Sequence, residues 1–151
     1  MLVIASDHGG LELKDAIKGL LQSRGLVVED MGTISPESVD YPDYGEKVAR
    51  AVSKGEAEQG ILICGTGIGM SIVANKFPGV RAALVTDEFT AQMSREHNDA
   101  NVLVMGGRVL SPEQASKMVS IWLDTEYEGG RHQRRLDKIA ELEHQLKGGT
   151  L

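Results

Sequence analysis

Cysteine and aromatic residues are scarce in this sequence, and positive charge is not in excess. A single cysteine in 151 residues cannot form a disulfide within the chain. Aromatic residues at 4% argue against the stacking platforms that bind single-stranded nucleic acid. A net charge of -6 argues against a general nucleic-acid or anionic-membrane surface, because both need a basic face.

Long apolar runs are also missing. No window approaches the roughly 20 apolar residues that span a bilayer. The amino-terminal segment lacks the basic start and apolar run of a secretory signal. We therefore expect a cytoplasmic protein with neither a nucleic-acid nor a membrane partner.

The remaining composition is that of an ordinary globular protein. Hydrophobic residues make up 41% of the chain and charged residues 25%, and the length is usual for one domain. We find no internal repeat and no linker. The expected organisation is a single domain over residues 1–151, with a frayed tail from about residue 147.

Short apolar runs alternate with longer stretches of helical periodicity. The nearly continuous apolar runs are typical of strands covered on both faces. They predict five strands, over 2–6, 26–29, 60–64, 80–86 and 101–105. Helices are predicted over 11–23, 42–53, 71–77, 88–97, 112–123 and 132–146. This alternation indicates a three-layer, doubly wound (Rossmann-like) α/β fold with a five-stranded parallel sheet. The long connection 30–41 is expected to help build the site.

The segment ILICGTGIGMS at 61–71 carries the main chemical signal. A buried strand ends at Cys64, and Gly65, Gly67 and Gly69 follow before the next helix. Glycines let successive backbone N–H groups turn inward and form an anion-binding nest, and a helix amino terminus adds partial positive charge. This setting favours the thiolate form of the cysteine.

Two other interpretations of this segment stay open from the residues alone. A lone cysteine that ends an apolar strand is more often an inert core residue. A glycine-rich turn after a strand more often binds a nucleotide phosphate, and Asp87-Glu88 lies where a ribose-binding carboxylate would be expected. Against a nucleotide, the spacing is G-x-G-x-G, and the Lys-Ser/Thr end of a P-loop is missing.

Two histidine clusters are further candidates. Asp7 and His8 directly follow the first strand, which normally neighbours the third strand in this fold, so we expect them to face Cys64. The alternative is that Asp7 only caps the first helix. His97 ends the fourth predicted helix, where a histidine is by default a partner of the helix dipole.

A tight basic cluster opens the last predicted helix. Arg131 and Arg135 are spaced i,i+4 and share one helix face, as a phosphate clamp requires. A solvated basic turn is the alternative. In an acidic chain, such a cluster indicates a small anionic ligand rather than a polymer.

Five stretches together resemble one family, the type B ribose-5-phosphate isomerases, which group with the galactose-6-phosphate and allose-6-phosphate isomerases. The stretches are SDHGG, GTISPESVDYPDY, GILICGTGIGMSIVANKFPGVRAALV, SREHNDANVLVMGGRV and YEGGRHQRRLDKI. They begin at the end of the first strand and run to about residue 139, so they cover nearly the whole chain. One branch of the family uses a glutamate of the glycine loop as its base. Met70 stands at that position here and cannot move a proton, so the chain resembles the cysteine branch.

The resemblance implies a role for each matching residue. Cys64 is the base that moves a proton between C2 and C1, and His97 opens the furanose ring. Asp7 and Thr66 lie near the ring hydroxyls. The implied anion hole for the enediolate is Gly65, Thr66, Gly67, Ile68, Gly69, Met70 and Ser71. The other implied substrate contacts are Tyr41 and Asn98, with His8, Arg108, Arg131 and Arg135 on the phosphate. The resemblance implies no cofactor and no metal.

The resemblance also implies a homodimer with shared active sites, in which His97 and part of the arginine set reach the partner's Cys64. A stripe on the last helix packs either on the partner or on the chain's own core, and the sequence leaves both open; the stripe is Leu136, Ile139, Leu142 and Leu146. A tetramer is also left open.

The expected reaction interconverts ribose 5-phosphate and ribulose 5-phosphate through an enediolate, in the non-oxidative branch of the pentose phosphate pathway. One alternative keeps the chemistry with a six-carbon substrate, allose 6-phosphate or galactose 6-phosphate. The other is a non-catalytic nucleotide- or flavin-binding module, suggested by the fold and the glycine loop.

Overall fold

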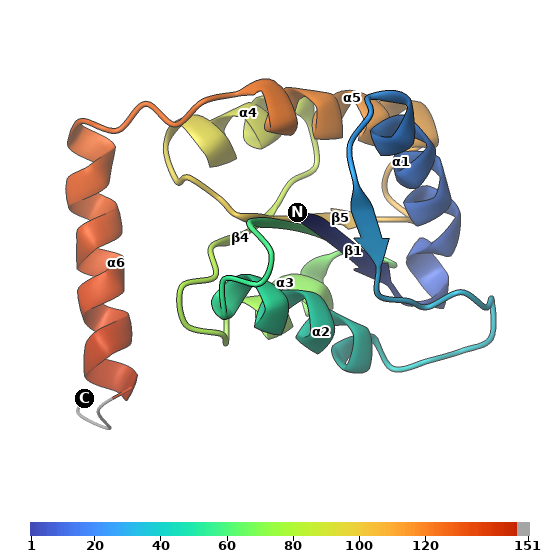
Figure 1. Cartoon of the computed structure of the whole chain (residues 1–151), viewed down its shortest axis with the longest axis horizontal. Helices are drawn as coiled ribbons and strands as arrows, with labels where there is room; N and C mark the ends of the chain where they lie inside the picture. The colour runs from blue at the N-terminus through green and yellow to red at the C-terminus, as the bar shows by residue number, and fades with distance from the viewer. Residues whose placement is uncertain (148–151) are drawn as a thin grey trace.

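Five parallel strands form the centre of the molecule in the computed structural model, which describes residues 1–147 (Figure 1). In chain order they are β1 (Leu2–Ser6), β2 (Val28–Asp30), β3 (Gln59–Cys64), β4 (Ala82–Leu84) and β5 (Val102–Gly106). Across the sheet they are ordered β2-β1-β3-β5-β4. The predicted α/β fold with a five-stranded parallel sheet is confirmed, and β1 lies beside β3 as expected.

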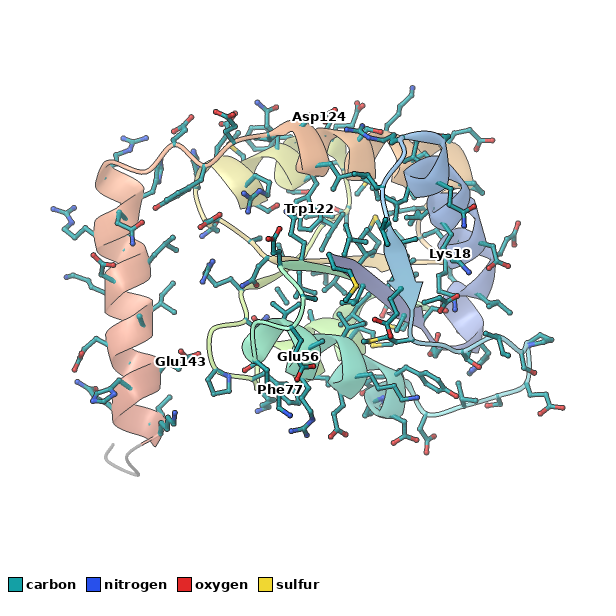
Figure 2. The ribbon with its side chains drawn as sticks, in the orientation of Figure 1. Lys18, Glu56, Phe77, Trp122, Asp124 and Glu143 are labelled. Carbon is teal, nitrogen blue, oxygen red and sulfur yellow. The ribbon has the colours of Figure 1, made fainter. Side chains whose placement is uncertain are left out.

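Helices cover both faces of this sheet, and each face has its own apolar core (Figure 1). On one face lie α1 (Leu11–Ser23), α4 (Glu88–Glu96) and α5 (Pro112–Asp124). On the other lie α2 (Tyr41–Ser53) and α3 (Ile68–Ala74). Figure 2 shows Trp122 between α5 and the sheet, and this side chain is fully buried. Burying a large apolar side chain stabilises a fold by about 1.5–3 kcal/mol, so the two cores hold the strand ends in place.

Most helices begin and end within two residues of their predicted limits, and α4 and α5 have side-chain caps at their starts. At α5, for example, Ser111 accepts the N–H of Gln114 and Pro112 opens the helix. The exception is α3, predicted over 71–77 and found at Ile68–Ala74. Gly67 has a φ of 84°, a left-handed conformation that glycine adopts without steric cost, and it starts the helix three residues earlier than predicted.

The two outer strands also differ from their predicted limits. β4 was predicted over 80–86 and spans only Ala82–Leu84, and β2 was predicted over 26–29 and spans Val28–Asp30. Each is an edge strand that pairs with one neighbour over three residues. Apolar residues beyond that pairing therefore do not extend the strand.

Helix α6 (Arg131–Lys147) stands apart from the layered body, beyond the β4 edge of the sheet (Figure 1). An extended segment leads to it from α5. Lys147 belongs to this helix rather than to the predicted frayed tail, and residues 148–151 of that tail lie outside the described residues. Within residues 1–147, every helix is too short or too polar to span a bilayer.

Candidate active site

The carboxyl ends of β1, β3 and β5 meet at one edge of the sheet, and the turns that follow them touch. A Cβ atom on Gly9 would lie 3.2 Å from the backbone nitrogen of Gly65. A Cβ atom on Gly106 would lie 2.7 Å from the carbonyl of Thr66. Only glycine allows backbones to approach this closely. The parallel topology therefore brings the segments after the three strands together; the contact between the segments after β1 and β3 was predicted, and that of the segment after β5 was not.

Cys64 ends β3 with its sulfur nearly enclosed. The residue is 4% exposed and belongs to the apolar core on the α2–α3 face. Its Sγ accepts a hydrogen bond from the backbone N–H of Gly67 at 3.2 Å. The burial is what an inert core cysteine would show. The N–H donor gives this sulfur one polar partner in an otherwise apolar environment.

The first turn of α3 offers further N–H groups beside this sulfur. The first intrahelical bond runs from the N–H of Ser71 to the carbonyl of Gly67 at 3.0 Å. The preceding amides, those of Ile68, Gly69 and Met70, therefore have no acceptor within the helix. Ser71 also donates its hydroxyl to Ile68 at 2.7 Å. The side chain of Met70 is fully buried, so this residue can offer only its backbone N–H to a ligand.

Asp7 and His8 occupy the turn after β1. Oδ1 of Asp7 accepts the N–H of Gly9 at 2.9 Å and caps the short 3-10 helix η1 (His8–Gly10), whereas the N-cap of α1 is Gly10. Nδ1 of His8 accepts the N–H of Val39 at 3.1 Å. In a neutral imidazole the proton then sits on Nε2. His8 is thus held as a donor toward an anion.

Three exposed side chains border the glycine loop. Tyr41 is 38% exposed, and its ring lies where a side chain on Gly69 would be. The backbone N–H of Arg108 donates to the carbonyl of Gly65 at 2.9 Å, and its guanidinium lies over that glycine. Thr66 is exposed between them. The structure therefore brings these predicted contacts to the Cys64 edge.

A buried lysine anchors the loop 31–40 that leads to this edge. Lys14 is fully buried, and its Nζ contacts Oδ1 of Asp30 at 2.7 Å and the carbonyl of Thr33. Lys18 contacts the other oxygen of Asp30 at 2.9 Å. Burial disfavours the charged form of Asp30, but hydrogen bonds from the two lysines and a backbone N–H outweigh it, so its pKa lies below the ordinary value.

His97 and Asn98 lie at the amino ends of the strands, whereas Cys64 lies at their carboxyl ends. They follow α4, which runs back against the strand direction, and lead into the start of β5. The carbonyl of Asn101 accepts the N–H of Gly60, at the amino end of β3, at 2.9 Å. Since β3 has 6 residues and a strand rises about 3.3 Å per residue, roughly 17 Å separates the two edges. Within one chain, the structure does not bring His97 to Cys64.

Two arginines hold the turn that follows α4. Asp99 has a φ of 45°, a left-handed conformation that costs a non-glycine residue about 1–2 kcal/mol. Arg95 bonds the Asp99 carboxylate and the carbonyl of Ala100, each at 2.8 Å. Arg81 donates to the carbonyls of Asp99 at 2.9 Å and Asn98 at 3.2 Å. These bonds offset the strain and fix the orientation of the turn.

Arg131 and Arg135 lie on the His97 side of the molecule. The N–H of Glu128 donates to the carbonyl of Glu96 at 3.1 Å, which ties the segment before α6 to the end of α4. Both arginines are exposed, and neither pairs with a carboxylate among the described residues 1–147. They are therefore available to an anionic ligand.

The sequence interpretation missed one residue of this cluster, His132. Its ring stacks on that of His97, with centroids 4.2 Å apart and planes at 17°. The residue is 6% exposed. The one available signal was Glu128, a carboxylate four residues before the histidine in the segment that precedes α6.

Asp87, the candidate ribose-binding carboxylate, is used to cap α4 instead. Its Oδ1 accepts the hydroxyl and the backbone N–H of Thr90, each at 2.7 Å, in a capping box. These two bonds hold the pKa of Asp87 below its ordinary value. The nucleotide interpretation thereby loses its best carboxylate.

Comparison with known proteins identifies the family of the chain. A family model described as Ribose/Galactose Isomerase matches residues 2–139. Over 142 residues the chain is 50% identical to the ribose-5-phosphate isomerase B of Escherichia coli strain K12, which covers 94% of this chain and 95% of that protein.

Two solved structures have the same fold as this chain. A ribose-5-phosphate isomerase B from Clostridium thermocellum is 54% identical, with a TM-score of 0.94 over 96% of this chain and 98% of that one. The enzyme from Mycoplasma genitalium, solved with bound ribulose-5-phosphate, is 44% identical, with a TM-score of 0.92 over 95% and 96%. The fold, the cysteine at its glycine loop and these similarities lead to one conclusion: the chain belongs to the ribose/galactose isomerase family.

Proposed function

We propose that this chain interconverts ribose 5-phosphate and ribulose 5-phosphate as an aldose–ketose isomerase. One observation carries the proposal. The sulfur of Cys64 accepts the N–H of Gly67 at 3.2 Å, directly beside the first turn of α3, where the Ile68 amide donates to Oγ1 of Thr66 and the Gly69 and Met70 amides have no acceptor within the helix. The ribulose-5-phosphate bound to the Mycoplasma genitalium enzyme supports the same substrate pair here.

The reaction needs one base and no external electron acceptor. In the open-chain aldose, the Cys64 thiolate removes the proton from C2. The C–H electron pair forms the C1–C2 double bond, and the carbonyl electrons move to O1, which gives an enediolate. The thiol then returns the proton to C1 while a proton passes from O2 to O1 and C2 becomes the carbonyl. C1 is reduced and C2 is oxidised within one molecule.

The glycine loop stabilises the intermediate. The amides of Gly69 and Met70, at the first turn of α3, can donate to the oxygen that gains charge. Preorganised donors of this kind contribute about 3–4 kcal/mol each in known oxyanion holes, and a positioned base adds roughly 100- to 10,000-fold. In the same proposal, Asp7 and Thr66 contact the sugar hydroxyls and Tyr41 covers the open side of the loop.

The phosphate is held at a distance from the reacting carbons. His8 is fixed as an Nε2 donor by its bond to Val39, and Arg108 lies over the glycine loop. Arg131 and Arg135 lie on the His97 side of their own chain, so in this proposal a second copy of the chain adds their two guanidiniums from one helix face. Binding energy gained there orients the substrate at Cys64.

A second copy of the chain completes the site in this proposal. His97 opens the sugar ring and Asn98 contacts the sugar, yet both lie roughly 17 Å from the Cys64 edge of their own sheet. They can act on the same sugar as Cys64 only if one chain supplies the cysteine and the other supplies the histidine. The dimer is therefore required by the chemistry; a tetramer of such dimers stays an expectation.

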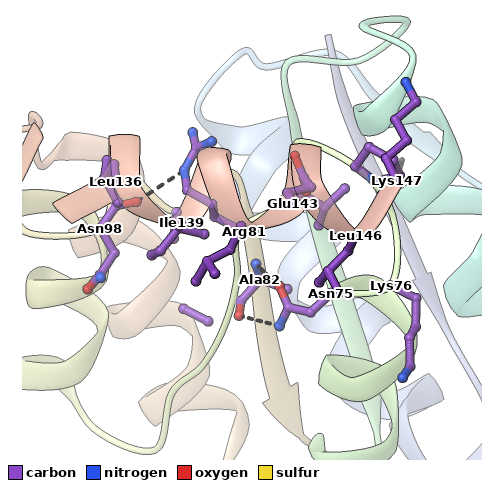
Figure 3. A pocket seen from close by; sticks show the side chains of 15 residues that line it. Asn75, Lys76, Arg81, Ala82, Asn98, Leu136, Ile139, Glu143, Leu146 and Lys147 are labelled. Atoms are coloured by element: carbon purple, nitrogen blue, oxygen red, sulfur yellow. Dashed lines mark hydrogen bonds between the residues drawn. The ribbon is translucent and has the colours of Figure 1, made fainter. Parts of the chain in front are cut away.

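Helix α6 supports this dimer. Ile139, Leu142 and Leu146 are 50%, 59% and 56% exposed, so the apolar stripe does not pack in the chain's own core. With the segment 75–83 they line a groove of about 870 Å³. Figure 3 shows Ile139 and Leu146 directed from α6 into this groove. Exposed apolar stripes that line grooves are typical of subunit contacts.

The organisation and location follow the same proposal. One family model spans residues 2–139, which supports a single domain over residues 1–151. A sugar-phosphate isomerase acts on metabolites of the cytoplasm, and a chain with one cysteine suits that reducing compartment.

A substrate panel on the purified protein tests the proposed function. With no added metal or nucleotide, kcat/KM for ribose 5-phosphate should exceed kcat/KM for allose 6-phosphate and galactose 6-phosphate. Cys64→Ala should lower kcat by about 100- to 10,000-fold without loss of fold. A higher kcat/KM for a six-carbon phosphate would refute ribose 5-phosphate as the preferred substrate. Full activity of Cys64→Ala would refute the assignment of Cys64 as the base. Thermal stabilisation by NAD or FMN, but not by sugar phosphates, would favour the nucleotide module.

A further inference from the structure

His132 is a buried histidine that the proposed mechanism does not use. It is 6% exposed, whereas its neighbours Arg131 and Gln133 on the same helix are exposed. Its ring stacks on His97, with centroids 4.2 Å apart and planes 17° from parallel. Burying a polar ring costs free energy unless the ring is partnered. The stack therefore places a second histidine directly against the group assigned to ring opening.

Both rings are anchored to the same helix end. Nε2 of His132 lies 3.3 Å from Oε2 of Glu128, in the segment that precedes α6. The N–H of Glu128 donates to Glu96 at 3.1 Å, and Glu96 precedes His97. The N–H of His97 bonds back to Met93 at 2.9 Å. The stack is thus held from both sides and does not depend on ring contact alone.

His97, Glu128 and His132 have side chains of the types that bind transition metals, and their ligand atoms lie within 4.8 Å of one another. A metal ion needs the lone pairs of both histidines to converge on one point. Rings that stack 17° from parallel direct their in-plane lone pairs side by side instead. The geometry therefore fits a positioning role better than a metal centre.

We propose that His132 is a positioning residue that holds the imidazole of His97 in the orientation required to open the sugar ring. This inference rests on the proposed function. Without a flat ring beside it, His97 can turn about its side-chain torsions. A displacement of about 1 Å at a catalytic group can cost on the order of 100-fold in rate.

The two directions of the reaction place different demands on His97. Ribose 5-phosphate is mostly a furanose, so it must be opened before Cys64 can act. Ribulose 5-phosphate cannot close such a ring, because the oxygen on C5 carries the phosphate, and it reaches Cys64 as an open chain. The reaction equilibrium ties the two kcat/KM values together. In the reverse direction the aldose leaves Cys64 as an open chain and closes its ring in solution, so a ring-opening defect lowers kcat with ribose 5-phosphate and spares kcat with ribulose 5-phosphate.

The experiment measures kcat in both directions for two variants of similar volume. His132→Phe keeps a flat ring against His97, and His132→Leu does not. With ribose 5-phosphate, His132→Leu should lose about 10- to 100-fold in kcat while His132→Phe stays near wild type. With ribulose 5-phosphate, both variants should stay within about twofold of wild type, since the proton transfer at Cys64 is untouched. Inhibition by inorganic phosphate should not change, because Arg131 and Arg135 are intact.

Three results would overturn the positioning role. They are equal activity of His132→Leu and wild type, an equal loss of kcat in both directions, and weaker phosphate inhibition in step with the loss. Circular dichroism and size-exclusion chromatography establish that each variant folds and assembles. If His132→Leu does not fold, the test uses His132→Phe alone. Loss of ribose 5-phosphate turnover in a folded His132→Phe would then refute the positioning role of the stacked ring, and retained turnover would support it. A wild-type protein inactive on ribose 5-phosphate would instead refute the proposed function.

Discussion

Pairing two inactive variants in one dimer should restore activity if the active site is shared. Cys64→Ala removes the base at one edge of the sheet, and His97→Ala removes the ring-opening group at the other, roughly 17 Å away. In a dimer that combines the two chains, one site contains both lesions. The other site takes its cysteine from the His97→Ala chain and its histidine from the Cys64→Ala chain, so it contains neither.

The expected magnitude follows from this count of sites. One intact site of two gives about one half of the wild-type kcat per dimer. Each chain carries a different affinity tag, and two purification steps isolate the mixed dimer from co-expressed protein. Isomerisation of ribose 5-phosphate is then measured at equal dimer concentration.

A second mixed dimer provides the matched control. It combines the wild-type chain with a chain that carries both substitutions. If the site is shared, each of its two sites contains one lesion and the dimer is inactive. A half-active control, together with an inactive Cys64→Ala/His97→Ala pair, would place both residues in one subunit's site and refute the argument from the two sheet edges.

Stability and assembly give three further predictions. Lys14→Met should lower the free energy of unfolding by about 3 kcal/mol in urea titrations, because it leaves Asp30 short of a partner and the carbonyl of Thr33 unpaired. The lowered pKa of Asp30 stabilises the fold above its unfolded value of about 3.9, and this stabilisation is lost as the pH falls through the folded value. Asp30→Asn should therefore reduce stability at pH 7 and weaken its loss at low pH, as urea titrations at both pH values would detect. Leu142→Asp should give an inactive monomer by light scattering, whereas His144→Asp, on the opposite face of α6, should leave an active dimer.

The sheet and most of its helices could be predicted because their signals are local. The strands β1, β3 and β5 are nearly continuous apolar runs, which only strands buried on both faces tolerate. Pro42 marked the start of α2, and Ser111 with Pro112 marked the start of α5. The start of α3 was missed because the left-handed conformation of Gly67 is a property of the backbone. The spacing of apolar residues in the sequence gives no sign of this backbone conformation.

The division of the site between two sheet edges follows from topology. In a parallel sheet, residues after strands gather at one edge, and residues after helices gather at the other. Asp7 and Cys64 follow or end strands, whereas His97 ends a helix. The alternation of strands and helices therefore predicts that, within one chain, His97 lies at the opposite end of the strands from Asp7 and Cys64. What it does not predict is the stack of His132 on His97, since that contact depends on the path of the extended segment before α6.

The most direct test of the central claim follows the proton itself. Ribulose 5-phosphate is incubated in deuterium oxide with wild-type protein or Cys64→Ala, and deuterium at C1 is measured by nuclear magnetic resonance. Equal inhibition constants for inorganic phosphate establish that the variant keeps its binding site. The account predicts rapid uptake of deuterium with the wild type and, with Cys64→Ala, uptake slower by about 100- to 10,000-fold. Uptake by Cys64→Ala at a rate near that of the wild type would contradict it.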